Sequence, residues 1–434
     1  MKRVCVKYNV ELDVHLKGKL LKWAEQFYEV AWLDSNNYEQ DHSSYKAILA
    51  VDAFTSIQTD YHQAFDKLNE YQTTIRDWLF GYLSYDLKND VERLSSNNHD
   101  GLGFPDLLFF QPKRLLLFTE KTVEFHYLNL VADEIDTDWQ QIRAIEAEKT
   151  IGNEQDAIKI SLRTSKDSYF EQVNRMLKHI ERGDIYEANF CQEFYSEGVT
   201  INPTKTFHHL NAISRPPFAT FFRNGPYYAM SASPERYLKK SANRLISQPI
   251  KGTARRFQNK KLDKEMIEKL RSDPKERSEN IMITDLVRND LSRLALKGTV
   301  EVEELCAVYT FEQVHQMIST IRCDVPEDMD PVEMIRHTFP MGSMTGAPKI
   351  SAMKIIEQLE ASKRGLYSGA IGYFSPRGDF DFNVVIRSIL FNSERKYVSY
   401  SVGGAITAGS VPENEYEECL LKAKAMREAL ERSK

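Results

Sequence analysis

Hydrophobic residues in the first third of the chain gather in short runs that suit β-strands. Residues 45–54 (YKAILAVDAF) and 78–87 (WLFGYLSYDL) are apolar runs of the length expected for buried strands. In residues 114–128 (RLLLFTEKTVEFHYL), apolar and polar positions alternate towards the end, which predicts a hairpin with one buried face. This part of the chain is therefore expected to supply mainly sheet.

Helical periodicity dominates after a polar, charge-rich passage at 144–156, which separates a region 1–145 from a region 160–430. Ser165 can cap a helix in which apolar residues recur every three or four positions until Gly183. Strand-like runs alternate with the helical ones, so the chain is expected to be of the α+β class. Further helices are predicted at 262–271, 275–292, 331–338, 347–360 and 412–431.

Composition and charge argue against several classes of protein. With 42% hydrophobic and 28% charged residues among 434, the chain has the make-up of a globular protein with a large core. It has no run of about 18 apolar residues and no apolar signal core at its start, so a cytoplasmic protein without membrane spans is expected. A net charge of −6 without a basic stripe argues against nucleic acid as a partner. The five scattered cysteines form no CxxC pair, which disfavours a disulfide framework or a thiolate metal site.

One lysine stands in an unusually apolar and tight sequence. Lys251 lies in SQPIKGTARR, between an isoleucine and a Gly-Thr pair and shortly after a proline. Lysine side chains usually reach into water, which favours a surface loop. The alternative is a desolvated amine with a lowered pKa that serves as a nucleophile. The decapeptide alone leaves both interpretations open.

Two predicted helices each carry a pair of carboxylates on one face. Glu276 and Glu279 lie three residues apart near the start of one helix, and Glu415, Glu418 and Lys422 share a face of the last helix. Carboxylate pairs on two helices could together hold Mg²⁺, which prefers oxygen ligands. Acidic helix faces are more often simply solvated, so spacing alone does not establish a metal site.

Other polar residues allow a structural and a functional interpretation. Glu235 in SASPERYL is either a surface or capping glutamate or a general acid or base. His315 is either a hydrogen-bonded core histidine or a functional one. Arg387, in the apolar run FNVVIRSIL, needs an anion, which could be a structural carboxylate or a substrate. Gly403 and Gly404 allow close backbone approach of a ligand, although a β-bulge explains them equally well.

Several long motifs follow one another along the chain. In order they are GDIYEANFCQ, SASPERYL, QPIKGTARR, SENIMITDLVRNDLSR, VHQMIST, FPMGSMTGAPKISAMKIIEQLE, GLYSGAIGYF, FNVVIRS and PENEYEE. Considered together, these motifs resemble those of the chorismate-utilising enzymes, in the same order. That family includes anthranilate synthase component I, aminodeoxychorismate synthase component I, isochorismate synthase and salicylate synthase. The resemblance is close over 165–428 and looser in the amino-terminal half.

The resemblance implies a fold and a reaction. The implied fold has two large antiparallel sheets packed face to face, helices outside, and strands from both halves of the chain. PIKGT resembles the aminodeoxychorismate-forming branch, whereas anthranilate synthases carry a small residue in place of Lys251. Lys251 would then attack C2 of chorismate as the 4-hydroxyl leaves, and ammonia would add at C4 to give 4-amino-4-deoxychorismate, a precursor of 4-aminobenzoate and folate.

The same resemblance implies roles for the other candidates. Glu235 matches the general acid/base, and His315 matches a histidine beside the substrate ring. Glu279 and Glu418 match the Mg²⁺ ligands, with Glu276 and Glu415 in the outer shell through water. The residues implied to bind the substrate are Thr253, Tyr367, Arg387, Gly403, Gly404 and Lys422.

The source of ammonia is expected to be another protein. None of the five cysteines is flanked by glycine as a glutaminase nucleophile would be, so a separate glutaminase subunit is the implied partner. Three alternatives stay open: anthranilate synthase, isochorismate synthase, and a catalytically silent subunit that binds an aromatic ligand such as tryptophan near LDSNN. The intact set of Lys251, Glu235, Glu279 and Glu418 argues against the silent subunit.

Overall fold

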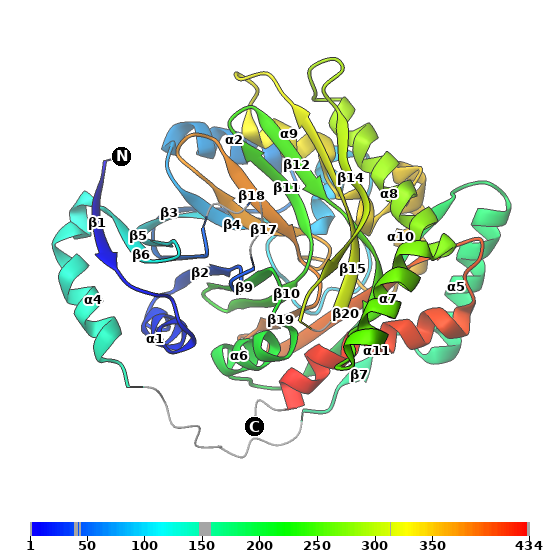
Figure 1. Cartoon of the computed structure of the whole chain (residues 1–434), viewed down its shortest axis with the longest axis horizontal. Coiled ribbons are helices and arrows are strands. Elements are labelled where there is room, and N and C mark those ends of the chain that lie inside the picture. Colours follow the sequence, from blue (N-terminus) through cyan, green and yellow to red (C-terminus); the bar gives the residue numbers. More distant parts are fainter. Residues whose placement is uncertain (1, 39–41, 43–44, 147–157, 313, 432–434) are drawn as a thin grey trace.

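Twenty strands of the chain pair into one continuous antiparallel network, as seen in a computed structural model that describes residues 2–38, 42, 45–146, 158–312 and 314–431. The predicted boundary at 144–156 lies almost entirely outside the described residues. The network bends into two layers, with helices on the outside (Figure 1). The expected α+β class with antiparallel sheets and external helices is thus confirmed.

Two long strands take part in both layers. β3 (Ala47–Thr59) and β5 (Leu107–Phe118) pair along most of their length, but their register shifts between Ala53 and Thr55. Asp52 adopts a positive φ of 63° at this point, and its carboxylate accepts hydrogen bonds from Lys113 and Arg114. A bulge of this kind bends a strand pair. It therefore turns the two layers towards each other.

The first layer takes strands from both ends of the chain. Besides the shared pair, its strands in order are β1 (Arg3–Asn9), β6 (Thr122–Leu128), β2 (Glu29–Asp34), β9 (Phe218–Asn224), β10 (Tyr227–Ser233), β19 (Ser388–Asn392), β20 (Tyr397–Thr407) and β8 (Glu187–Glu197), with β7 (Ser161–Leu162) and β16 (Gly346–Ala347) on β8. The early strand β2 pairs with β9, and the late strand β20 pairs with β8. One face of this layer packs on the other layer, and the opposite face packs on helices. Successive residues along its strands therefore point alternately into these two cores.

The second layer begins at the shared strand β5 and runs through β4 (Leu79–Leu83) to the long strand β15 (Val314–Asp324). The strands between β4 and β15 are β17 (Ala370–Phe374), β18 (Phe380–Val384), β11 (Arg236–Ser241) and β12 (Arg244–Gln248), with β13 (Ile250–Arg255) and β14 (Glu301–Thr310) flanking β15. This layer faces the first through aromatic contacts such as Tyr82 against Phe222, whose ring centroids lie 5.5 Å apart.

The helices cover the outer faces of the two layers (Figure 1). Apolar residues of six helices pack on the first layer: α1 (Val14–Ala24), α4 (Ile135–Ala144), α5 (Lys166–Glu181), α6 (Pro203–Ser214), α10 (Lys349–Leu359) and α11 (Pro412–Glu431). The core of the second layer includes residues of α2 (Ala64–Ile75), α8 (Pro274–Ser292) and α9 (Pro331–Thr338), while α7 (Lys260–Ser272) covers β13. In the described part of the chain, no helix is long and apolar enough to cross a membrane.

Most predicted elements lie within a few residues of their observed positions. The helix capped by Ser165 is α5, and Ser165 Oγ accepts a hydrogen bond from the backbone N–H of Ser168 at 3.2 Å. The strand predicted at 78–87 ends earlier, at Leu83, because the next residues form the 3₁₀ turn η1 (Tyr85–Leu87). Tyr85 N–H there donates to the carbonyl of Gly365, a contact that the local sequence does not reveal.

We predict that Gly81→Ala strongly destabilises the fold. Gly81 on β4 lies opposite Gly372 on β17, where strands from the two halves of the chain meet. A Cβ atom at Gly81 would lie 2.0 Å from the carbonyl oxygen of Leu108, so the backbone must shift. We expect the free energy of unfolding in urea to fall by about 3 kcal/mol.

Gly18→Ala is the matched control. Gly18 lies inside α1, and a Cβ atom there would have nothing within 4 Å, so alanine should raise the free energy of unfolding by up to about 1 kcal/mol. Equal urea midpoints for the two variants would contradict the close strand approach at Gly81.

Candidate active site

Lys251 lies on β13, at a point where the strand departs from regular pairing with β15. The register shifts between Ile250 and Thr253, and Gly252 has a φ of +91°, a conformation that favours glycine. The Lys251 side chain is only 11% exposed, and its Nζ donates a hydrogen bond to Glu187 Oε1 at 3.1 Å. The surface-loop interpretation of this lysine is therefore wrong.

The electrostatic surroundings of Lys251 differ from the expectation of a lowered pKa. Burial alone would lower the pKa of Lys251, but the carboxylates of Glu187, Glu279 and Glu235 raise it above its ordinary value. The prediction of a depressed pKa is therefore wrong for this arrangement, which holds the amine as a cation. A nucleophilic Lys251 must first lose a proton.

Glu235 lies in the turn between β10 and β11 and is 4% exposed. Burial raises its pKa from 4.5 to about 7, although nearby Lys251 acts in the opposite direction. The carboxyl lines a small cavity together with Ser247, Asp290 and Ser343. Glu235 is therefore not a surface glutamate, and it can donate or accept a proton near neutral pH.

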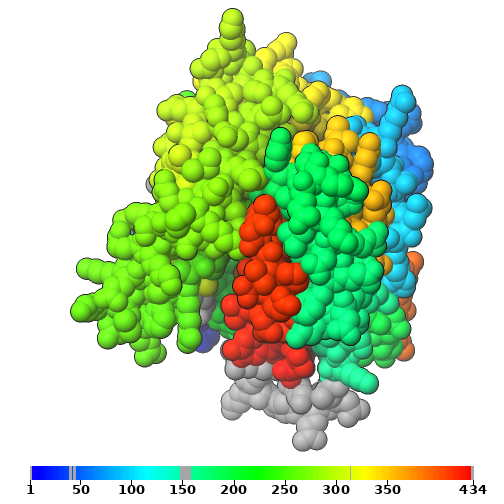
Figure 2. Space-filling model, turned by 90° about the vertical axis from the view of Figure 1, so that its right-hand side faces the viewer, coloured from blue at the N-terminus to red at the C-terminus, as the bar shows by residue number. Residues whose placement is uncertain are grey.

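The carboxylate pairs of α8 and α11 come together as the helical spacing predicts. Lys275 Nζ lies 3.8 Å from Glu279 Oε1 and 3.8 Å from Glu415 Oε1, which places the two helix faces opposite each other. Lys422 Nζ lies 2.7 Å from Glu418 Oε1 and donates to the carbonyl of Gly403 at 2.9 Å. Figure 2 shows the face of the molecule on which α11 (red) lies next to α5 (blue-green), with the region of α7 and α8 (yellow-green) on its other side.

These carboxylates have the chemistry of a divalent-cation site. Glu279 Oε1 is buried without a hydrogen-bond partner among the described residues, and burial raises the pKa of Glu279 to about 7. Burial also raises the pKa of Glu276. For Glu418 burial acts in the same direction, but Lys422 and Lys275 outweigh it and lower the pKa. A cation would supply the missing partner of Glu279, so the residues fit Mg²⁺.

The described carboxylates are nevertheless not gathered into a tight ligand cluster. Within the described ranges, the set of three potential ligand atoms that lie within 4.8 Å of one another is formed by Cys5, Glu124 and His126 on the β1–β6 pair, not by the glutamates of α8 and α11. Lys275 stands between Glu279 and Glu415 instead.

His315 on β15 is buried, and both of its ring nitrogens are occupied. Nδ1 lies 2.9 Å from Thr310 Oγ1, and Nε2 lies 3.0 Å from Asp263 Oδ1. These two contacts match the structural alternative for His315, a core histidine held by hydrogen bonds. The next residue, Gln316, lies opposite Thr253 of β13, and its buried side-chain oxygen has no partner among the described residues. Sequence reasoning missed Gln316.

Arg387 occupies the connection between β18 and β19 rather than a strand. Its φ of 52° interrupts the predicted strand, so this part of the prediction is wrong. Burial lowers the pKa of its guanidinium, while Tyr367 and Glu418 act in the opposite direction. No acidic side chain of the described residues forms an ion pair with it, which leaves the guanidinium available to a bound anion.

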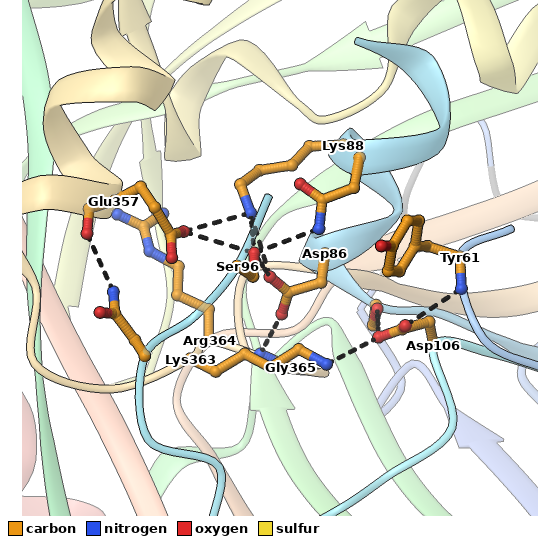
Figure 3. A network of polar contacts seen from close by, with 12 residues as sticks. Tyr61, Asp86, Lys88, Ser96, Asp106, Glu357, Lys363, Arg364 and Gly365 are labelled. Atoms are coloured by element: carbon orange, nitrogen blue, oxygen red, sulfur yellow. Dashed lines mark hydrogen bonds and ion pairs between the residues drawn. The ribbon is translucent and has the colours of Figure 1, made fainter. Parts of the chain in front are cut away.

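A polar network holds Lys363, Arg364 and Gly365, shortly before Tyr367 in the sequence. Figure 3 shows the part of this network around Asp86 and Asp106. Asp86 Oδ2 accepts a hydrogen bond from the N–H of Gly365 at 2.8 Å, and Lys363 Nζ donates to Asp106 Oδ1 at 3.2 Å. Arg364 pairs with Glu360 at 2.6 Å and also donates to the carbonyls of Met344 and Asn189. The network thereby ties the residues just before Tyr367 to four other segments of the chain, around Asp86, Asp106, Asn189 and Met344.

Of the remaining substrate-binding candidates, Lys422, Gly403 and Gly404 lie together. Lys422 Nζ donates to the Gly403 carbonyl, and a Cβ atom at Gly404 would be 4.0 Å from Lys422 Nζ. Thr253 follows the lysine turn on β13 and is exposed. Besides Gln316, sequence reasoning missed Glu187 and Lys275. A charged residue within the apolar strand of GDIYEANFCQ was the available signal for Glu187.

We predict that Glu235→Gln reduces the pH dependence of stability. Because burial raises the pKa of Glu235 from 4.5 to about 7, the folded protein holds this proton more tightly than the unfolded chain. The resulting stabilisation is complete below pH 4.5 and is lost as the pH rises through 7. The substitution should abolish a decline of about 3 kcal/mol in the free energy of unfolding, measured by urea unfolding across this pH range.

Glu327→Gln, at an exposed position, serves as the control and should leave the pH profile of the wild type unchanged. A Glu235→Gln profile that matches the wild type would contradict a raised pKa at Glu235.

Comparison with known proteins identifies the family of the chain. Residues 28–428 match the family described as chorismate binding enzyme. Anthranilate synthase component 1 of Thermus thermophilus is 34% identical over 360 residues, which cover 81% of this chain and 77% of that protein. Aminodeoxychorismate synthase of Streptomyces griseus is 36% identical over 357 residues, which cover 79% of this chain and 48% of that protein.

The fold has a close counterpart among solved structures. Anthranilate synthase component I from Streptococcus pneumoniae aligns with a TM-score of 0.78 at 24% identity, covering 90% of this chain and 95% of that chain. The structural likeness supports the fold, and the family match runs from β2 into α11, so it includes both glutamate-bearing helices. The chain therefore belongs to the chorismate-binding enzymes.

Proposed function

We propose that the chain is aminodeoxychorismate synthase component I, which converts chorismate and ammonia to 4-amino-4-deoxychorismate for the synthesis of 4-aminobenzoate and folate. The observation that carries the proposal is the burial of Lys251 in a hydrogen bond with one carboxylate and close to a second, Glu235. Similarity alone leaves the branch open, because the relatives named anthranilate synthase and aminodeoxychorismate synthase are about equally similar.

Each step of the proposed reaction has a residue to perform it. Lys251 Nζ, once neutral, attacks C2 of the chorismate ring while the 4-hydroxyl leaves, and Glu235 donates the proton that turns the departing group into water. Ammonia then bonds to C4 as the lysine nitrogen leaves C2, and the new ammonium group returns a proton to Glu235. A pKa of about 7 lets Glu235 act both as donor and as acceptor.

Recognition of chorismate, a dianion, requires positive charge in an otherwise acidic site. Arg387 is the strongest candidate, because no acidic side chain of the described residues neutralises its partly buried guanidinium. Lys422 supplies a second cation next to the backbone of Gly403. The remaining residues proposed to contact the substrate are Thr253, Tyr367 and Gly404.

The proposal includes Mg²⁺ held by Glu279 and Glu418, with Glu276 and Glu415 contributing through water. Glu279 Oε1, which has no hydrogen-bond partner among the described residues, supports this assignment. When bound, the ion would offset the negative charge of the substrate's ring carboxylate. Lys275 would then have to give up its position between Glu279 and Glu415.

We further propose that ammonia comes from a separate glutaminase subunit. The Thermus thermophilus relative carries "component 1" in its name, which supports a partner component for this chain as well. Anthranilate synthase is the second candidate function, since that relative supports it directly. Isochorismate synthase and a silent binding subunit are further outcomes that the product assay distinguishes.

The decisive assay is product identification by mass spectrometry after incubation with chorismate, Mg²⁺ and an ammonium salt. We expect 4-amino-4-deoxychorismate from the wild type and a rate lower by on the order of 10³-fold or more from Lys251→Ala, because the nucleophile is gone. Lys261→Ala, at an exposed position on α7, should retain the wild-type rate. Anthranilate or isochorismate as the product would overturn the branch, and no product would favour a silent subunit.

Mg²⁺ binding is testable without turnover. We expect saturating Mg²⁺ to raise the free energy of unfolding of the wild type by roughly 1–3 kcal/mol, since an ion that binds only the folded state stabilises it. Glu279→Gln should remove most of this increase. The exposed Glu268→Gln on α7 should keep it. Equal stabilisation of all three proteins would contradict the assignment of Glu279 as a ligand.

A further inference from the structure

Glu187 is the carboxylate in direct contact with Lys251, and neither the family resemblance nor the proposed reaction has assigned it a role. It lies at the start of β8, where it pairs with Thr407 of β20 on one side and Ala347 of β16 on the other. The residue is 1% exposed. Oε1 accepts the hydrogen bond from Lys251, while Oε2 is buried without a partner among the described residues.

A purely structural explanation of this pair is weak. Burial of an ion pair is often no more stabilising than apolar residues of similar size, so it is poor evidence of a role in stability. Here the pair joins residues 64 positions apart, at the one amine proposed to become a nucleophile. A nucleophile within hydrogen-bonding distance of a base is the usual arrangement in covalent catalysis.

The other acidic groups around Lys251 are less suited to receive its proton. Four face the amine from different elements: Glu187 on β8, Glu235 in the β10–β11 turn, Glu279 on α8 and Glu418 on α11. Glu235 must carry a proton when it acts as the acid, and Glu279 and Glu418 are the proposed metal ligands. Glu187 alone among these accepts a hydrogen bond from Lys251 Nζ.

We propose that Glu187 is the general base of Lys251, taking a proton from Nζ before the amine attacks and returning it when the amine leaves. The assignment rests on the proposed function. The two buried carboxyl groups then begin the cycle in opposite protonation states. Glu187 starts deprotonated and accepts a proton from Lys251 Nζ, whereas Glu235 starts protonated and donates its proton to the leaving hydroxyl oxygen.

The protons balance over the cycle. The Lys251 ammonium passes one proton to Glu187, and the free amine forms the C2–N bond while the C4–O bond breaks and Glu235 protonates the leaving oxygen. When ammonia forms the C4–N bond, the C2–N bond breaks and releases neutral lysine, which recovers its proton from Glu187. The new C4 ammonium protonates Glu235, so one water molecule is the net by-product.

Glu187→Gln separates this role from simple charge pairing, because glutamine can still accept the hydrogen bond but no longer takes up a proton. Loss of the carboxylate also makes the Lys251 amine easier to deprotonate. If Glu187 acted only through its charge, the variant would therefore react as fast as the wild type or faster. If Glu187 is the general base, the variant reacts more slowly by about 10²–10⁴-fold.

The first readout is the rate at which chorismate alone forms a covalent adduct on Lys251, followed by intact-protein mass spectrometry. The second is the pH profile of 4-amino-4-deoxychorismate formation with an ammonium salt. We expect the defect of Glu187→Gln to shrink as pH rises, because solvent then takes the proton, and Glu187→Asp to recover part of the rate. Glu197→Gln, at the exposed end of the same strand, is the matched control.

Thermal unfolding of each variant shows whether a lost rate reflects lost folding, and Glu187→Asp keeps the test valid if Glu187→Gln is unstable. Wild-type formation of 4-amino-4-deoxychorismate with an undiminished adduct rate in Glu187→Gln would overturn the assignment of Glu187 alone. A different wild-type product would overturn the proposed function, and the assignment with it.

Discussion

The constraint on which the site depends is the balance of charge around one buried amine. The carboxyl groups that meet in this region outnumber the cationic side chains even before an anionic substrate arrives. The excess is relieved in part because burial raises the pKa values of Glu235 and Glu279 to about 7. The same excess keeps Lys251 protonated. Catalysis in such a site must therefore begin with the movement of a proton.

The fold serves this site by bringing distant segments together and holding them rigidly. Lys251 comes from an irregular strand, its hydrogen-bonding carboxylate from β8 and the acidic pairs from two helices. Arg364, which pairs with Glu360, donates hydrogen bonds to the carbonyls of Asn189 and Met344 and so holds the segment before Tyr367 to them. In the proposed reaction, preorganisation of this kind would let Lys251 and Glu235 approach the substrate ring without large rearrangement.

Local patterns predicted the elements well but not the contacts between them. Periodicity and capping placed the helix capped by Ser165, and helical spacing placed Glu276 with Glu279 on one face, because both follow from interactions within one turn. The raised pKa of Lys251 and the strand end at Leu83 depend on partners remote in sequence. The usual exposure of glutamate side chains also gave the wrong expectation for Glu235, since its buried carboxyl is an exception to that tendency.

The pairing of early strands with late ones has a consequence for biosynthesis. β4 finds its neighbour β17 only after the long stretch of chain between them has been made, and β8 stays unpaired along its long edge until β20 has been made. Contacts of such high sequence separation fold slowly, and exposed strand edges invite pairing with other chains. The nascent chain must therefore carry unpaired strand edges during much of its synthesis, and these edges are its most exposed sites for wrong pairing with other chains.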